Sequence, residues 1–238
     1  GAPTLKRVHF ELGGKNPVIV FDDADLERAL DAVVFMIYSL NGERCTSSSR
    51  LLIQSSIADK FIEKLTARVK ALKVGHPLDP ATEVGPLILP READRVSSWI
   101  DEVRNQPHRL IGGGRLSETT LKPAILVEPP TDAKVSRLEV FGPLACVYRY
   151  SDIDQAIEAA NDLPFAFQAS VFSTDIGPAL RAAERLDASN VMVNDHTAFR
   201  TDWMPFAGRR QSGYGVGGIP YSMEEMAQEK MLVLRYDG

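Results

Sequence analysis

The residues best suited to chemistry in this sequence are one cysteine and one glutamate, each in a short loop that contains glycine. Cys45 lies in the small polar turn 41–46, and Glu11 immediately precedes a Leu-Gly-Gly segment. A cysteine attacks as its thiolate, so neighbouring charges decide its reactivity. Arg44 favours the thiolate and Glu43 opposes it, which leaves the pKa of Cys45 open. An isolated cysteine is also often a small buried hydrophobe, and that alternative stands beside the catalytic one.

A thiol and a carboxylate without a histidine are sufficient for one kind of chemistry. A thiolate adds to an aldehyde to give a thiohemiacetal, hydride leaves to a nicotinamide, and the resulting thioester then needs an activated water. Glu11 is a suitable base for that water if partial burial raises its pKa. A cysteine hydrolase would instead need a histidine beside Cys45, and His196, in a polar loop, keeps that alternative open.

Metal and nucleotide motifs are not recognisable in the sequence. The four histidines and two cysteines have no ligand spacing, so we expect no metal site. The glycine-rich segment 212–218 has no strand directly before it and has Pro220 where a helix should start, so it does not match a dinucleotide fingerprint. Residues 112–114 are three glycines without the lysine of a phosphate-binding loop. Both segments are predicted to be turns.

Composition restricts the classes of partner. The chain has 238 residues and a formal net charge of −5, which disfavours nucleic acid and anionic membranes as partners. Two cysteines, Cys45 and Cys146, do not make a disulfide scaffold and favour a reducing compartment. The longest apolar stretch, 33–37, is too short to cross a bilayer. We therefore expect a cytoplasmic protein that does not bind membranes.

Apolar periodicity predicts alternating strands and helices. Asp22 or Asp23 is expected to cap the first helix. The predicted strands are 18–21, 51–54, 124–127, 145–150, 169–172 and 191–194, and the predicted helices are 26–37, 57–72, 91–103, 153–160 and 178–186. This order predicts an α/β fold with an open, mostly parallel sheet and helices on both faces.

In such sheets ligands bind where loops meet at the carboxyl ends of the strands. The loops expected there are the Cys45 turn, 138–143 and the long segment 195–220. The apolar tail 230–236 is predicted to be a further strand. It either closes the edge of its own sheet or joins another subunit, because an unpaired apolar strand promotes aggregation.

Four motifs occur in the order and approximate spacing of one family. They are Glu11-Leu12-Gly13-Gly14-Lys15-Asn16-Pro17, Asn41-Gly42-x-x-Cys45, Glu139-Val140-Phe141-Gly142-Pro143 and Pro205-Phe206-x-Gly208-x-x-x-Ser212-Gly213. With these motifs the sequence resembles the aldehyde dehydrogenase superfamily over nearly its whole length. The resemblance implies the hydrolytic, NAD(P)-dependent type, because members that transfer the acyl group to coenzyme A typically lack the base at Glu11.

The resemblance also implies roles for individual residues. Cys45 would be the nucleophile, with its amide as one oxyanion donor, and Glu11 the general base. Glu139 would hold the nicotinamide ribose and Phe141 would pack beside the nicotinamide. Leu12 and Gly13 would also lie against the cofactor, which is NAD or NADP. The residues that would distinguish the two cofactors belong to a part of the family's subunits that this sequence does not contain.

Subunits of that family are about twice as long as this chain and begin with a cofactor-binding domain. The resemblance therefore implies a catalytic domain at 1–228 and an oligomerisation strand at 229–238, with the N-terminal domain absent. It implies a homo-oligomer, a dimer or tetramer, for the full-length protein. We expect the chain by itself to be inactive or nearly so, because the second oxyanion donor of the family is an asparagine in the absent half.

The substrate is less defined than the reaction. Arg44, Arg200 and Phe206 are the expected substrate-binding residues, and the two arginines favour a small anionic aldehyde of the semialdehyde or phosphonoacetaldehyde type. The arginines could equally pair with nearby acids, while Phe199 and Trp203 keep a neutral aryl or aliphatic aldehyde open. A different class of function, a non-enzymatic assembly fragment that joins subunits through its tail, remains an alternative.

Overall fold

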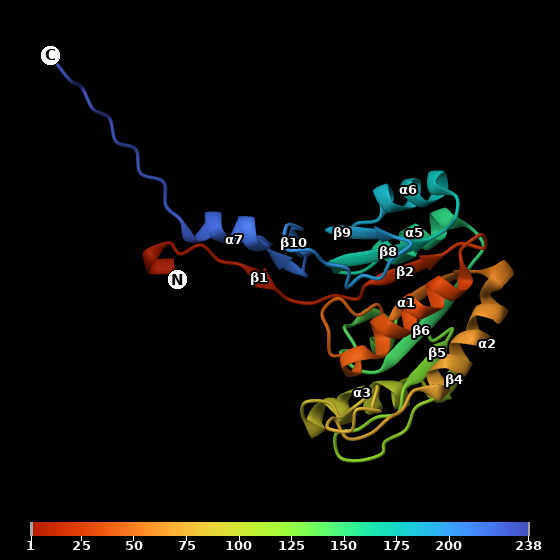
Figure 1. Ribbon diagram of the computed structural model, residues 1–238. Coiled ribbons are helices and arrows are strands. Elements are labelled where there is room, and N and C mark those ends of the chain that lie inside the picture. Colours follow the sequence, from red (N-terminus) through yellow and green to blue (C-terminus); the bar gives the residue numbers. More distant parts are fainter. Residues whose placement is uncertain (1, 238) are drawn as a thin grey trace.

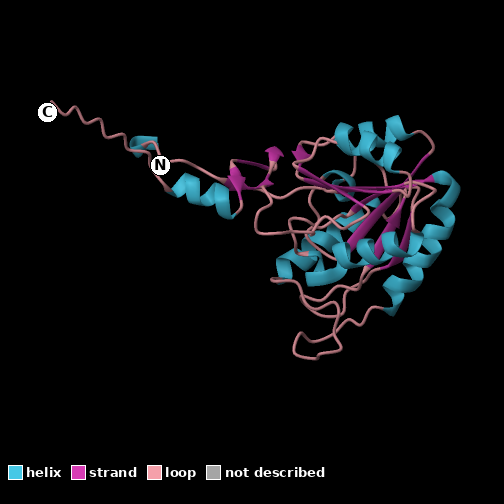
Figure 2. Ribbon diagram, turned by 45° about the horizontal axis from the view of Figure 1, so that its top comes forward, coloured by secondary structure: helices cyan, strands magenta, loops and turns pink. Residues whose placement is uncertain are grey.

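A seven-stranded sheet forms the centre of the molecule, with helices on both of its faces (Figures 1 and 2). The structure is a computed structural model and describes residues 2–237. In spatial order the strands are β4 (Arg109–Gly112), β5 (Ala124–Val127), β6 (Leu144–Tyr150), β3 (Arg50–Gln54), β2 (Pro17–Val20), β8 (Gln168–Phe172) and β9 (Asn190–Val193). All neighbours pair in parallel except β4 with β5, which confirms the predicted fold class.

The predicted helices are present, with small differences at their ends. The helices are α1 (Leu26–Tyr38), α2 (Ser55–Ala71), α3 (Pro90–Val103), α4 (Lys134–Arg137), α5 (Ile153–Asn161), α6 (Ile176–Arg185) and α7 (Ile219–Met226), with 3-10 turns η1 (Ala2–Thr4) and η2 (Ser39–Gly42). Short strands pair outside the main sheet: β1 (Phe10–Glu11) with β12 (Gly213–Tyr214), β10 (Phe206–Ala207) with β13 (Val216–Gly217), and β7 (Phe165–Ala166) with β11 (Arg209–Arg210). The sequence patterns had not predicted β4, α4, α7 or these short strands.

Each face of the sheet has its own apolar core because side chains alternate along every strand. In β2, Val18 and Val20 pack with α1 and α2, whereas Ile19 packs on the opposite face with α3, α5 and α6. Burial on both faces explains why the central strands read as continuous apolar runs.

The first helix begins at Leu26, as predicted, but a different aspartate caps it. Asp25 caps α1 by accepting a hydrogen bond from the Arg28 amide, so the prediction of Asp22 or Asp23 as the cap is wrong. Asp23 instead accepts hydrogen bonds from Ser173 and from the amide of Asp175, across the neighbouring strand. Because the Asp23 carboxylate accepts these hydrogen bonds from another loop, it is not available to cap α1. The sequence alone does not show this long-range contact.

The C-terminal part of the chain extends away from the sheet (Figure 1). Pro220 stands in the first turn of α7, where its missing amide costs no hydrogen bond, so our inference that it prevents a helix was wrong. Residues 227–237 have no regular secondary structure, and Met231 to Leu234 are exposed. The tail therefore does not close the edge of its own sheet. Gly1 and Gly238, the ends of the two expected segments, lie outside the described residues.

The described residues contain neither a membrane-spanning helix nor a cluster of metal ligands. None of the helices within residues 2–237 combines the length and the apolar character needed to span a membrane. Within the same residues, histidine, cysteine and acidic side chains form no group of three that could hold a metal ion.

Candidate active site

The predicted site residues gather at the amino ends of the parallel strands and not at the carboxyl ends. Gly14 lies just before β2, Cys45 just before β3 and Glu139 just before β6. These three strands are neighbours, so the loops that enter them meet at one edge of the sheet. The expectation of a carboxyl-end site was wrong for the Cys45 turn and for 138–143. The rule describes loops that leave strands, whereas these two loops enter them.

Asn16 joins the segment that contains Glu11 to the Cys45 turn. Its amide nitrogen donates hydrogen bonds to the carbonyls of Cys45 (2.8 Å) and Ser47 (2.9 Å), and its amide oxygen accepts from the Gln168 amide (2.9 Å). The side chain is buried. One residue thus holds the Cys45 turn in register with two neighbouring strands.

The turn before Cys45 requires glycine at position 42. Gly42 has φ of +74°, and a Cβ there would lie 2.2 Å from the carbonyl oxygen of Gly142. Leu40 and Asn41 also have positive φ, so α1 ends in a tight left-handed turn. Asn41 stabilises this turn by donating to the Pro86 carbonyl at 2.9 Å. The close contact with Gly142 brings the Cys45 turn against the loop that contains Glu139 and Phe141.

A second buried contact secures the other side of the turn. Thr197 donates its hydroxyl hydrogen to the Thr46 carbonyl (2.6 Å), so the hydroxyl of Ser48, 2.7 Å away, must be the donor to Thr197. Thr197 belongs to the long loop after β9, which returns toward the amino edge of the sheet: Asn190, at the start of β9, donates to the Pro205 carbonyl at 3.0 Å. The loop after β9 therefore reaches the Cys45 turn at the amino edge, and its expected place at the carboxyl edge was wrong as well.

The electrostatic environment of Cys45 favours the neutral thiol. Burial raises its pKa, and the negative charges of Glu11 and Glu139 raise it further. Hydrogen bonds from the backbone amides of Thr46 and Cys45 oppose that rise. The guanidinium of Arg44 lies over the Phe35 ring, 5.2 Å from its centroid, and is not the group that sets the charge state of the thiol.

Glu139 folds onto the glycine pair. Its Oε1 accepts a hydrogen bond from the Gly14 amide at 3.1 Å, and a Cβ at Gly13, whose φ is +79°, would lie 2.3 Å from the same oxygen. Burial raises the pKa of Glu139. Leu12 and Phe141 are exposed beside this carboxylate, with 59% and 37% of their surfaces accessible. A carboxylate beside exposed apolar side chains suits a ligand that carries both hydroxyl groups and a flat ring.

Glu11 lies on β1, and 48% of its side chain is exposed. Strand β1 pairs with β12, and the Leu12 amide donates to the Ser212 carbonyl at 2.9 Å. The structure therefore holds the backbone of Glu11 firmly and leaves its carboxylate accessible to water.

Neither Arg44 nor Arg200 forms an ion pair with another described residue, so the pairing with nearby acids that the sequence left open is not observed. Arg44 stacks on Phe35, whose ring also contacts His196. Arg200 lies over Phe206, 4.5 Å from the ring centroid, and Phe206 contacts Phe167 edge-on. Each guanidinium thus retains donors that a substrate anion can accept from.

Lys15, the lysine of the first motif, is buried in the protein interior. Its ammonium donates to the Val135 carbonyl at 2.7 Å, and burial lowers its pKa to about 8. Sequence reasoning assigned no role to Lys15, Asn16, Ser48 or Thr197. The available signal was their polarity next to apolar strands, because a polar side chain at such a position must find a buried partner.

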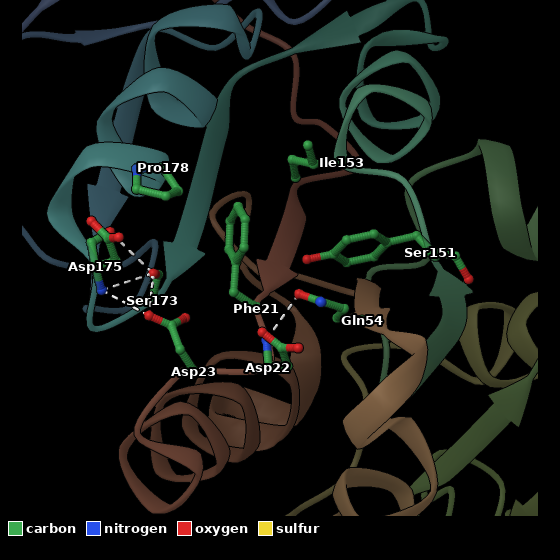
Figure 3. A pocket seen from close by; sticks show the side chains of 10 residues that line it. Phe21, Asp22, Asp23, Gln54, Ser151, Ile153, Ser173, Asp175 and Pro178 are labelled. Atoms are coloured by element: carbon green, nitrogen blue, oxygen red, sulfur yellow. Dashed lines mark hydrogen bonds between the residues drawn. The ribbon is translucent and has the colours of Figure 1, made fainter.

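The carboxyl edge of the sheet has a cavity of its own, with a volume of about 360 Å³. Figure 3 shows Phe21, Gln54 and Ser173 around it. Ser173 is hydrogen-bonded to the Asp23 side chain and to the Asp175 amide. The Gln54 side chain accepts a hydrogen bond from the Asp22 amide. None of the predicted site residues lines this cavity. Its acidic groups are occupied by neighbouring loops, so it does not compete with the amino-edge cluster as a candidate active site.

Fold and site together describe an α/β domain in which the charges of two carboxylates, Glu11 and Glu139, act on the half-buried thiol of Cys45. The model of the aldehyde dehydrogenase family matches residues 1–232, and the chain belongs to that family.

Known proteins show the same relationship. The chain is 36% identical to 3-sulfolactaldehyde dehydrogenase of Priestia aryabhattai (97% of this chain, 48% of the relative) and 37% identical to lactaldehyde dehydrogenase of Methanocaldococcus jannaschii (97% and 49%). The crystal structure of glyceraldehyde-3-phosphate dehydrogenase GapN from Methanocaldococcus jannaschii, complexed with NADP, superposes with a TM-score of 0.89 at 37% identity (93% and 48%). The chain spans about half the length of the curated relatives it matches.

Proposed function

We propose that this chain provides the nucleophile and the base of an NAD(P)-dependent aldehyde dehydrogenase that releases a carboxylic acid. The observation that carries the proposal is the position of Cys45. Asn16, which follows the Glu11 segment, donates a hydrogen bond to the Cys45 carbonyl, and the charges of Glu11 and Glu139 both act on the Cys45 thiol. Among the described residues no histidine is hydrogen-bonded to Cys45, so a thiol with a carboxylate base suits aldehyde oxidation better than cysteine hydrolysis.

In the proposed reaction the sulfur of Cys45 bonds to the aldehyde carbon, and the Cys45 amide donates a hydrogen bond to the resulting oxyanion. A bound nicotinamide supplies the acceptor for the hydride that leaves this carbon. Glu11 then takes a proton from water as the water oxygen bonds to the thioester carbon. The carbon–sulfur bond breaks, the acid leaves and Cys45 is restored.

The residues present fit such a cofactor. Glu139 offers a carboxylate to ribose hydroxyls, and the bare backbone of Gly13 allows close approach beside it. Phe141 and Leu12 offer exposed apolar surface to a nicotinamide ring. We propose NAD or NADP as the cofactor, with these four residues as its contacts in this chain.

The relatives are about twice as long as this chain, and this difference in length bears on what the whole enzyme needs. We propose that activity needs a further cofactor-binding half, so the chain by itself is inactive or nearly so. The exposed apolar residues of the tail, Met231 to Leu234, would pair as a strand with a neighbouring subunit of a dimer or tetramer. Both cysteines are free, which favours a reducing compartment such as the cytoplasm.

A small anionic aldehyde is the proposed substrate class. Arg44 and Arg200 have no carboxylate partner among the described residues, and the guanidinium of each lies over an aromatic ring. The names of two relatives, 3-sulfolactaldehyde and glyceraldehyde-3-phosphate dehydrogenases, describe anionic aldehydes. The lactaldehyde relative and the exposed rings of Phe199 and Trp203 favour a neutral aldehyde as the second candidate.

Arg200→Ala tests the substrate class. For the full-length protein we expect kcat/KM for a carboxylated or phosphorylated aldehyde to fall about 10-fold or more, because a charge-assisted hydrogen bond is lost. The value for propanal should stay within about twofold, and Arg181→Ala on the exposed face of α6 should change neither substrate. Equal losses on charged and neutral aldehydes would contradict an anion-binding role.

The function itself is tested by trapping the covalent intermediate. The full-length protein, mixed with an aldehyde and NAD or NADP, should reduce the cofactor and gain the mass of an acyl group on the peptide that contains Cys45. Cys45→Ala should lose both signals, whereas Cys146→Ala should keep them, because Cys146 is a buried residue of the central strand β6. Absence of both signals in the unmodified full-length protein would favour the non-enzymatic assembly alternative, and cofactor reduction that survives Cys45→Ala would assign the nucleophile to another residue.

A further inference from the structure

His9 lies between two carboxylates beside the proposed base. Its Nε2 is 3.3 Å from Oε1 of Glu11, and its Nδ1 is 3.8 Å from Oε2 of Glu225. Nε2 is buried, and no hydrogen bond of good geometry satisfies it. The imidazole therefore has one nitrogen facing the base and the other facing a second acid.

The strand pairing places the imidazole there. His9 and Glu11 are two residues apart on one extended segment, so their side chains lie on the same face. The antiparallel register between β1 and β12 brings this face against the glycine-rich segment. A Cβ at Gly215 would lie 2.8 Å from His9 Nδ1, and a Cβ at Gly217 would lie 3.3 Å from Glu11 Oε1. The glycines leave the space that the imidazole and the carboxylate occupy.

Glu225 is held in position from the same N-terminal segment. Arg7 donates through Nη1 to the carbonyls of Glu224 and Glu225 at 3.3 Å, which fastens the last turn of α7 beside His9. Arg7 and Glu225 also line an open cavity of about 770 Å³. The charged groups around the imidazole are thus Glu11 and Arg7 from its own segment and Glu225 from α7, and Glu225 has direct access to water.

We propose that His9 positions Glu11 and conducts its proton to solvent through Glu225, an inference that rests on the proposed role of Glu11 as base. After Glu11 has taken a proton from the attacking water, that proton passes from Oε1 to Nε2 of His9. The proton on Nδ1 passes to Glu225 and from there to water in the open cavity. One proton enters the relay and one leaves, so Glu11 is again a carboxylate, and His9 regains its starting tautomer by proton exchange with water before the next turnover.

An activated aryl ester, 4-nitrophenyl acetate, isolates this step in the full-length protein because it acylates Cys45 without a dinucleotide. The burst of nitrophenol reports acylation, and the steady-state rate reports hydrolysis of the thioester. In His9→Ala we expect an unchanged burst and a steady-state rate lower by about 10-fold or more. Imidazole should restore that rate, whereas pyrazole, a ring of the same size but far weaker basicity, should not.

Matched variants separate relay from packing. His9→Gln keeps a donor near Glu11 but carries no exchangeable pair of nitrogens, so it should keep its burst and melting temperature and still hydrolyse slowly. Glu225→Gln should slow hydrolysis in the same direction, and His108→Ala, near β4, should match the unmodified protein. A full steady-state rate in His9→Ala and His9→Gln, or rescue by pyrazole as good as by imidazole, overturns the relay. A burst that survives Cys45→Ala overturns instead the proposed function of Cys45.

Discussion

Replacing Glu11 with glutamine is expected to leave Cys45 able to form its thioester while nearly stopping hydrolysis of that thioester. Glutamine has almost the same shape but accepts no proton, and general-base catalysis contributes about 10²–10⁴-fold to such steps. Turnover in the full-length protein should fall by that factor, and the acylated protein should accumulate. Intact-mass spectrometry after mixing with aldehyde and cofactor measures both the amount and the lifetime of this species.

The same substitution should make the thiol more reactive toward iodoacetamide at neutral pH. The charge of Glu11 raises the pKa of Cys45 by opposing the thiolate, so its removal lowers that pKa and increases the thiolate fraction at pH 7. The pH profile of alkylation should shift to lower pH in Glu11→Gln and also in Glu139→Gln.

The control for both measurements is Glu63→Gln on the exposed face of α2, which should match the unmodified protein in hydrolysis and in alkylation. Cys146 is not a suitable reference because its burial alone makes it slow. Fast thioester hydrolysis in Glu11→Gln would assign the base to another residue. An unshifted alkylation profile would mean that the carboxylate of Glu11 does not act on the thiol.

Replacing Asn16 with alanine is expected to have the largest effect on stability. The substitution removes both donors to the carbonyls of Cys45 and Ser47 and the acceptor of the Gln168 amide, in a buried site. Each buried backbone group left without a partner costs about 1–3 kcal/mol, so the free energy of unfolding should fall by about 3–5 kcal/mol. Urea denaturation of the chain, followed by circular dichroism, measures this change.

Asn16→Asp separates the two halves of that contact. Aspartate still accepts from the Gln168 amide but places a carboxylate oxygen against two carbonyls, so it should also destabilise and should slow alkylation of Cys45. Asn105→Ala, in an exposed turn after α3, should change the unfolding free energy by less than about 0.5 kcal/mol. A small effect of Asn16→Ala would show that the Cys45 turn is held mainly by Gly42 and Thr197.

Much of the fold could be predicted because strands and helices of this chain carry strong local signals. The apolar run 18–21 predicted β2, and the periodicity of 26–37 predicted α1. Each predicted end lies within one residue of the observed end. Short strands such as β1 and β12 have two residues each and no pattern of their own, because their pairing depends on chain segments about 200 residues apart. The cap of α1 was mispredicted for a similar reason, since Asp23 bonds to the distant Ser173 loop.

The sequence by itself determined the candidate reactive groups, the order of the motifs and the alternation of strands and helices, because these depend on residue type and local spacing. Only the tertiary structure decided which edge of the sheet carries the site, since that requires knowing that β2, β3 and β6 are neighbours. It also decided that the charges of Glu11 and Glu139, and not Arg44, act on Cys45, because the Arg44 guanidinium turns to the Phe35 ring. Electrostatic influence depends on distance in space, and a sequence neighbour can direct its charge elsewhere.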